Sequence, residues 1–244
     1  MIIPKTIPED VETQLSQDYG RIQGAMTICI YNFEGSNFAA DAISAYIYSN
    51  SSLQIHTIVD KSVPEWIGPG TDVILMSYAG SNRYIESIYN VVKARGSRIH
   101  CITSGGLLAD FCRSNGDDLH LVPEGLSPFE ATGFEMGALV NLYDSLGVEG
   151  LKDAVKRMIP RLKAYRDEIW GSEYVWKLAM KVNGAIPVIY SSGEMRAVHK
   201  RWKILLNDVT EKLAFSGELP EFDHNEIVGW TEDADNKEFI IIII

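Results

Sequence analysis

The residues best suited to bind a small anion lie in three turns rich in glycine and hydroxyl side chains, each following a hydrophobic segment. Backbone N–H groups at a helix start, together with serine or threonine hydroxyls, can hold a phosphate without a lysine. A structural interpretation weighs about equally, in which serine and asparagine only cap the helices beginning at Ser36 and Ser81. The three turns are Gly35–Ser36, Ser77–Asn82 and Thr103–Gly106.

A second candidate for chemistry is His224, in a polar, acidic and aromatic segment, residues 219–230, that lacks helical or strand periodicity. Irregular segments in compact domains often carry site residues. Asp223, Asn225 and Glu226 are its neighbours, so His224 can act as a proton donor or acceptor near neutral pH. The spacing equally supports a structural histidine whose hydrogen bonds hold the loop in shape.

Other reactive groups have little support from their spacing. The five histidines are scattered without a zinc-ligand pair, so we expect no metal. Ser192 is not in a G-x-S-x-G motif and is not expected to be a nucleophile. Cys29, Cys101 and Cys112 have no CxxC spacing, which predicts reduced thiols in a core and a cytoplasmic protein.

The charge balance restricts the partners. Lysine and arginine total 22 against 33 for aspartate and glutamate, and the net charge of -11 repels a nucleic-acid backbone. A small anionic ligand therefore needs a local site. We expect neither a signal peptide nor a membrane span.

Short apolar segments alternate with helical ones, which predicts an α/β fold with parallel strands covered on both faces. Residues 128–170 are helical throughout, and a second β/α segment then repeats the order of the first. We therefore predict two similar subdomains, residues 1–150 and 151–244, the second incomplete. The expected strands are residues 26–31, 53–59, 72–76, 98–103, 119–122, 186–190 and 239–244, and the expected helices include 36–49, 81–95, 173–182 and 194–207.

The last expected strand, residues 239–244, is an apolar run ending in five isoleucines. It is too short for a bilayer and predicts a buried parallel strand. Such a strand makes an adhesive sheet edge, so we expect either a truncated fold or a strand covered by a partner subunit.

Four segments together carry a resemblance to a known family: IPVIYSSGEMRAVHKRWKILLND, LPEFDHNEIVGW, ITSGGLLA and SYAGSN. Over most of its length the sequence resembles the bifunctional phosphoglucose/phosphomannose isomerases, a branch of the sugar-isomerase (SIS) domain proteins. The resemblance implies two SIS subdomains with parallel, flavodoxin-like sheets in a homodimer, the second subdomain shortened here. It implies an active site between them for glucose, mannose and fructose 6-phosphates, without metal or cofactor.

The implied chemistry is acid–base catalysis on a sugar: the ring opens, a base removes the proton beside the carbonyl, and the proton returns to the neighbouring carbon. The family histidine that assists ring opening, contributed across the dimer, matches His224. The family base is a glutamate, and Asp208 stands in its place. Its carboxylate reaches one methylene less far, and a misplacement of about 1 Å can cost roughly 100-fold in rate.

The phosphate loop departs from the family pattern Ser-Tyr-Ser-Gly-Asn-Thr. Ser77, Tyr78 and Gly80 match it, whereas Ala79 and Asn82 replace the second serine and the threonine. Two hydroxyls of the implied phosphate site are therefore lost.

Three further departures concern charge. Glu34 replaces the first glycine of the family's Gly-Gly-Ser turn beside Ser36, and Phe129 replaces an arginine that steadies the enediolate. Arg83, just past the phosphate loop, could supply a cation in place of that arginine, although the interpretation as an exposed helix residue without function is favoured. The family's ring-opening lysine, which follows the terminal strand, has no counterpart in this sequence.

Two functions of different classes remain open. The first is an active or weakly active sugar-phosphate isomerase with Asp208 as base and His224 as ring-opening acid. The second is a non-catalytic SIS protein that binds a phosphosugar as a regulator or dimer partner. The preferred sugar phosphate stays undetermined. The candidate phosphate-binding residues are Gly35, Ser36, Ser77, Gly80 and Asn82.

Overall fold

The first part of the chain forms a five-stranded parallel sheet in a computed structural model that describes residues 5–24, 26–33, 38–59, 61–230 and 238–244. The strand order is β2-β1-β3-β4-β5, the order of flavodoxin-like doubly wound sheets. The predicted α/β class with a parallel, flavodoxin-like sheet is therefore confirmed. The strands are β1 (Thr27–Asn32), β2 (Gln54–Ile58), β3 (Thr71–Met76), β4 (Arg98–Thr103) and β5 (Asp118–Leu121).

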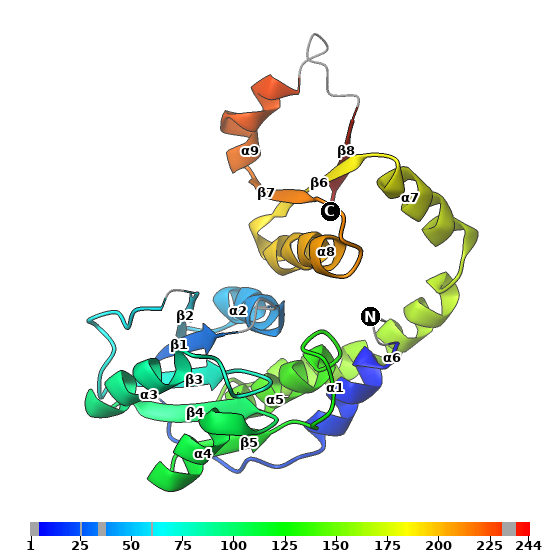
Figure 1. Ribbon diagram of the computed structural model, residues 1–244. Helices are drawn as coiled ribbons and strands as arrows, with labels where there is room; N and C mark the ends of the chain where they lie inside the picture. Colours follow the sequence, from blue (N-terminus) through cyan, green and yellow to red (C-terminus); the bar gives the residue numbers. More distant parts are fainter. Residues whose placement is uncertain (1–4, 25, 34–37, 60, 231–237) are drawn as a thin grey trace. The chain divides into compact units, whose positions relative to one another are not determined.

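Helices cover both faces of this sheet (Figure 1). Alternate strand residues point to opposite faces, so Ile28 and Ile30 pack on one side and Cys29 and Tyr31 on the other. All three cysteines are buried free thiols, as predicted. The first face is covered by α1 (Ile7–Leu15), α2 (Phe38–Asn50) and α5 (Thr132–Ser145), and the second by α3 (Ile85–Ala94) and α4 (Gly106–Asn115).

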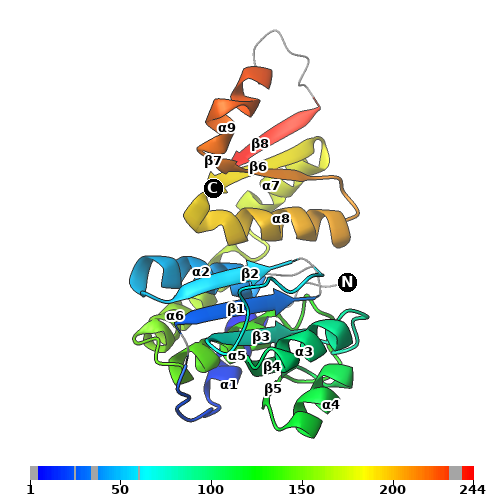
Figure 2. The same cartoon turned by 90° about the vertical axis from the view of Figure 1, so that its left-hand side faces the viewer.

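The second part of the chain forms a smaller parallel sheet with β6 between β7 and β8 (Figure 2). Helix α7 packs against β6, and α8 packs against β6 and β7. Two compact units result, Ile2–Leu162 and Lys163–Ile244. No helix in the described part of the chain is long and apolar enough to cross a membrane. The elements are α6 (Leu151–Ile169), α7 (Glu173–Asn183), β6 (Ile186–Ser192), α8 (Arg196–Asp208), β7 (Phe215–Leu219), α9 (Glu221–His224) and β8 (Phe239–Ile243).

Several local expectations were wrong. Helix α1 and strand β7 were not predicted, because α1 is short and acidic at its start and β7 reads FSGEL, without an apolar run. Residues 219–230 contain α9 and a 3₁₀ turn, Glu226–Gly229, where no helical structure was expected. Strand β8 is parallel as predicted, yet alternate residues are exposed, with Ile243 70% exposed.

The amino ends of β3, β4 and β5 hold a buried charged cluster. Asp72 Oδ1 lies 3.0 Å from Arg98 Nε and 3.5 Å from His100 Nε2, and Asp118 Oδ2 lies 3.0 Å from His100 Nδ1. Burial opposes charge on His100, but the two aspartates outweigh it and raise its pKa. Burial, and then the charge of His100, lower the pKa of neighbouring His120 to about 4.

The carboxyl edge of the sheet is built differently, by two backbone turns in direct contact. Gly80 has φ +62°, and a Cβ on it would lie 1.9 Å from the carbonyl oxygen of Gly105. A Cβ on Gly106 would lie 2.3 Å from the carbonyl oxygen of Ala79. The turn after β3 and the turn after β4 therefore fit together only because neither glycine has a side chain.

Replacing Gly80 should therefore disrupt this edge far more than replacing a glycine of similar φ in open space. Gly116 has φ +67° and nothing within 4 Å of a built Cβ, so Gly116→Ala carries only the backbone cost, about 1 kcal/mol. Gly80→Ala adds a clash with backbone and should cost more than about 3 kcal/mol of unfolding free energy. Denaturant unfolding of both variants measures the difference, and equal losses would refute the close packing.

The buried His120 should make stability fall in acid. Its folded pKa of about 4 lies below the unfolded value of about 6.5, so the unfolded chain binds more protons in that window. Stability from this group is present above about pH 6.5 and lost as the pH falls toward 4. His120→Phe, which keeps a ring beside Tyr19 (centroids 4.2 Å apart in the parent), should flatten the pH dependence between these limits.

Denaturant unfolding at a series of pH values tests this, with the exposed histidine replaced in His56→Phe as control. An unchanged slope in His120→Phe would contradict the assignment.

Candidate functional site

Ligands of open parallel sheets bind beyond the carboxyl ends of the strands, near the point where the strand order reverses. In this sheet that point lies between β1 and β3. The loop from Ser77 to Asn82 follows β3 and lies there, beside the Thr103–Gly106 turn. Gly35 and Ser36 lie outside the described residues.

The polar groups of the phosphate-loop candidates bind within the loop and its neighbours. Ser77 is 1% exposed, and its Oγ accepts a hydrogen bond from the Gly80 N–H at 3.2 Å. Asn82 Nδ2 donates to the Phe33 carbonyl at 3.1 Å, and Asn82 Oδ1 accepts from the Tyr84 N–H at 3.0 Å. Asn82 thus links the end of β3 to the end of β1.

This arrangement corrects one expectation. Because the Asn82 side chain turns the chain at Tyr84, α3 begins at Ile85 with Tyr84 at its N-cap, and Ser81 does not cap it. Beside this start lie two cations: Arg83, which the sequence offered as a substitute cation, and Lys61, which it did not indicate.

Phe129 stands where the family has an arginine. Phe129 is half-buried in the turn before α5, and its carbonyl accepts a hydrogen bond from Thr132 Oγ1 at 2.9 Å. Within the described ranges, no three His, Cys, Asp or Glu side chains are grouped as metal ligands.

The two predicted catalytic residues, Asp208 and His224, lie at opposite ends of β7. Asp208 is the exposed last residue of α8 and precedes the strand, whereas exposed His224 ends α9 and follows it. Among the described residues, no contact joins the Asp208 and His224 side chains, and β7 stands between them along the chain.

A buried tyrosine anchors the segment that carries His224. The Tyr190 hydroxyl donates to the Glu226 carboxylate, and the rings of Tyr190 and Phe222 lie 4.3 Å apart. Burial, and then the carboxylate, raise the pKa of Tyr190 to about 12. A Cβ on Gly217 would lie 2.7 Å from this ring, which explains the glycine in β7.

The role of His224 in the loop follows from this anchor. Glu226 and Phe222 hold the loop in shape, and no described residue hydrogen-bonds to the His224 side chain. The described contacts therefore assign the shaping of the loop to Glu226 and Phe222, and both interpretations of His224 stay predictions.

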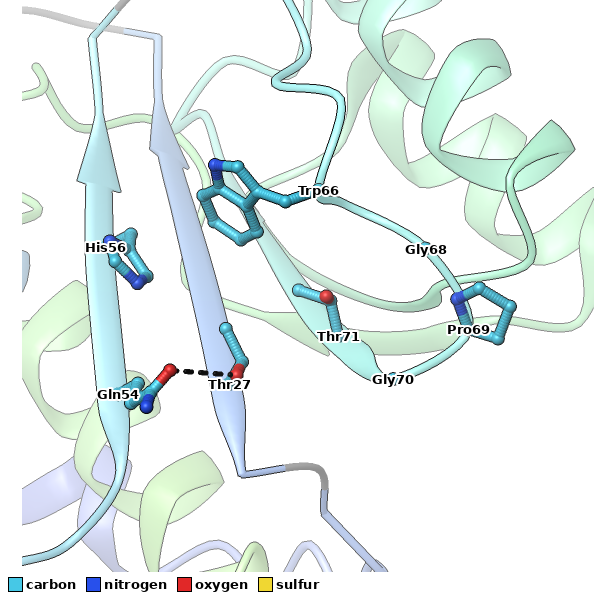
Figure 3. A pocket seen from close by; sticks show the side chains of 8 residues that line it. All are labelled: Thr27, Gln54, His56, Trp66, Gly68, Pro69, Gly70 and Thr71. Atoms are coloured by element: carbon cyan, nitrogen blue, oxygen red, sulfur yellow. Dashed lines mark hydrogen bonds between the residues drawn. The ribbon is translucent and has the colours of Figure 1, made fainter.

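A pocket of about 490 Å³ lies elsewhere, at the amino ends of β1, β2 and β3 (Figure 3). The rings of His56 and Trp66 lie 4.7 Å apart in it, and Thr27 Oγ1 donates to Gln54 Oε1 at 3.4 Å. It contains none of the residues predicted from the sequence. Since parallel sheets bind ligands at the other edge, we do not place the active site here.

Comparison with known proteins supports the resemblance seen in the sequence. Residues 172–244 match the bacterial phospho-glucose isomerase C-terminal SIS domain. The bifunctional phosphoglucose/phosphomannose isomerase of Caldicellulosiruptor bescii is 28% identical over 83% of this chain and 62% of its own length. Over most of its length the chain is similar to the bifunctional phosphoglucose/phosphomannose isomerases.

Two proteins with other activities are also similar to this chain. The D-glucosamine-6-phosphate 4-epimerase of Sulfolobus acidocaldarius is 25% identical over 97% of this chain and 74% of its own length. The C-terminal domain of glucosamine-fructose-6-phosphate aminotransferase from Francisella tularensis shares the fold, with a TM-score of 0.70 and 14% identity over 98% of this chain and 73% of that one. The segment that matches the SIS family model includes both Asp208 and His224.

The Tyr190 anchor makes a separate prediction. Tyr190→Phe keeps the ring against Phe222 but removes the donor to Glu226, so it should cost about 1 to 2 kcal/mol and speed amide exchange in residues 221–229. Tyr143→Phe is the matched control, because the buried Tyr143 hydroxyl has no hydrogen-bond partner among the described residues. Hydrogen–deuterium exchange measures the effect, and equal exchange of 221–229 in both variants would contradict the anchor.

Proposed function

We propose that this chain is a sugar-phosphate isomerase that interconverts glucose 6-phosphate or mannose 6-phosphate with fructose 6-phosphate. The observation that carries the proposal is the placement of Asp208 and His224 at the two ends of β7, both exposed, within the segment that matches the SIS domain. Because the chain spans 62% of the length of its C. bescii relative, the proposal concerns the chemistry of these residues.

In the proposed reaction, His224 gives a proton to the ring oxygen as the ring of the aldose opens, and it regains one, by way of water, from the anomeric hydroxyl, which becomes the C1 aldehyde. Asp208 then removes the proton on C2 of the open sugar, and the electrons move into an enediolate between C1 and C2. The Asp208 carboxylic acid returns the proton to C1, and the proton of the C2 hydroxyl passes to O1, which leaves the C2 ketone. A base at Asp208 needs no metal or cofactor in this scheme.

A homodimer is the working form that we infer. Strand β7 stands between Asp208 and His224 along the chain and no described contact joins them, which supports an acid–base pair completed by His224 from a second copy. The three buried free thiols support a cytoplasmic location. A closed two-fold dimer then contains two equivalent sites, each with residues from both chains.

A non-catalytic phosphosugar-binding protein is the second candidate. Phe129 supplies no positive charge to an enediolate, and the shorter Asp208 places its carboxylate farther from the substrate than a glutamate would. Loss of such charge stabilisation costs roughly 100-fold or more in rate.

Turnover that depends on Asp208 is the first test. Purified protein is assayed for fructose 6-phosphate formed from glucose 6-phosphate and from mannose 6-phosphate. Asp208→Asn should abolish turnover and leave ligand affinity nearly unchanged, whereas Asp208→Glu should raise the rate if the shorter acid limits it. Turnover unchanged by Asp208→Asn would exclude it as the base.

The same assay separates the alternatives. Glucosamine 6-phosphate is included with NMR detection of inversion at C4, because the Sulfolobus relative is a 4-epimerase. Thermal stabilisation by a sugar phosphate without turnover of any substrate would favour the non-catalytic binder.

Complementation tests the shared site. Chains carrying Asp208→Asn and chains carrying His224→Gln are each expected to be inactive, and refolding them together should restore roughly a quarter of the parental activity. Random pairing makes half of the dimers contain one chain of each variant. Such a dimer has one site with both Asp208 and His224 intact, and one without either, only if each site takes the two residues from different chains. No recovery, with dimers verified by light scattering, would refute the shared site.

A further inference from the structure

Two cations flank one tyrosine ring at the carboxyl edge of the first sheet. Lys61 Nζ and Arg83 Cζ each lie 4.7 Å from the centre of the Tyr84 ring. Both cationic residues are exposed, and Tyr84 is half-buried at the N-cap of α3. The sequence separates Lys61 from Arg83 by 22 positions, so only the fold brings them together.

Specific hydrogen bonds place this pair at the point where the strand order reverses. Lys61 follows β2, and its neighbour Ser62 accepts a hydrogen bond at its carbonyl from the Tyr31 hydroxyl of β1, at 3.0 Å. Arg83 follows Asn82, whose amide is bonded to Phe33 just past β1. The loops after β2 and β3 are thus both tied to β1, and both cations lie at the Tyr84 ring, next to the Ser77–Asn82 loop.

Two cationic side chains lie at one ring in a protein whose net charge is -11. A hydrogen bond from Lys61, and further the charge of Arg83, lower the pKa of the Tyr84 phenol. No carboxylate of a described residue lies within 4.0 Å of the Arg83 guanidinium. Two like charges held at one ring repel each other, and an anion that contacts both is favoured there.

The loop itself supplies few hydroxyls for such an anion. Ser81 is exposed and carries a hydroxyl, whereas Ala79 is exposed and has none. Ser77 is buried, and the Asn82 amide is bonded to Phe33 and Tyr84. Arginine offers paired N–H donors to phosphate oxygens, and lysine binds them as a point charge.

We propose that Lys61 and Arg83 bind the phosphate group of the substrate. Charge at this edge replaces the hydroxyl contacts that Ala79 and Asn82 do not provide. The identity of the sugar rests on the proposed function, but the binding of phosphate by these two side chains does not.

Isothermal titration calorimetry at low ionic strength tests the proposal, with inorganic phosphate, glucose 6-phosphate and uncharged glucose as probes. Each of Lys61→Gln and Arg83→Gln should weaken both phosphate ligands by roughly tenfold, the effect of losing one charge-assisted hydrogen bond. The double variant should bind them about as weakly as the parent binds glucose. The parental affinity should also fall as salt is added, because the cations are exposed.

The matched control replaces an exposed lysine and arginine of α6 in Lys156→Gln/Arg157→Gln, which changes the net charge equally. Equal weakening in this control, or unchanged phosphate affinity in the Lys61 and Arg83 variants, would overturn the proposal. So would a parent that binds neither phosphate ligand. Thermal unfolding identifies any variant whose fold is affected, and Tyr84→Phe, which keeps the ring, should retain binding.

The two proposals fail separately. Turnover that is lost in Asp208→Asn, together with affinity that is unaffected by Lys61→Gln/Arg83→Gln, would refute only the cationic phosphate site. Phosphate binding that is lost in Lys61→Gln/Arg83→Gln, without turnover in the parent, would refute only the isomerase.

Discussion

The contact between the turn after β3 and the turn after β4 determines the shape of the whole carboxyl edge. Gly80 and Gly105 touch through backbone atoms, and Tyr78 beside them connects three loops. Its carbonyl accepts from the Ser104 N–H at 2.8 Å, while its hydroxyl donates to the Pro123 carbonyl and accepts from the Leu126 N–H. The loops after β3, β4 and β5 are therefore held by one buried residue, and the loop that begins at Ser77 has little freedom.

The two edges of this sheet differ in their charged groups: those at the amino edge pair with one another, and those at the carboxyl edge are exposed to a ligand. At the amino edge, His100 and Asp72 are fully buried, and the charges of His100 and Arg98 are balanced by those of Asp72 and Asp118. At the carboxyl edge, Lys61 and Arg83 are exposed around Tyr84. Strong perturbation of a buried histidine is often a sign of a functional site, but here the perturbed group has no access to solvent. The exposure of the charged side chains, rather than a shifted pKa, therefore identifies the sheet edge that can bind a ligand.

The sequence predicted what depends on continuous local pattern. Buried parallel strands such as residues 72–76 and 98–103 are apolar on both faces, so their positions and the flavodoxin-like order could be anticipated. Strand β7 could not, because Gly217 makes room for the Tyr190 ring and leaves no hydrophobic run. The pairs Lys61 with Arg83 and Tyr190 with Glu226 come from separate elements, so no spacing rule reveals them.

Recognition by charge has consequences that recognition by hydroxyl groups does not. Hydroxyl and backbone donors discriminate by geometry and lose little in salt, whereas exposed cations attract any dianion and are screened within about 8 Å at physiological ionic strength. Selectivity at this edge must then come from what lies beside the cations. The Ser77–Asn82 loop is fixed by Gly80 and Tyr78, so its backbone N–H groups stand in one arrangement relative to Arg83. A rigid loop beside two exposed charges allows the cations to supply the attraction and the loop to select the geometry of the phosphate ester.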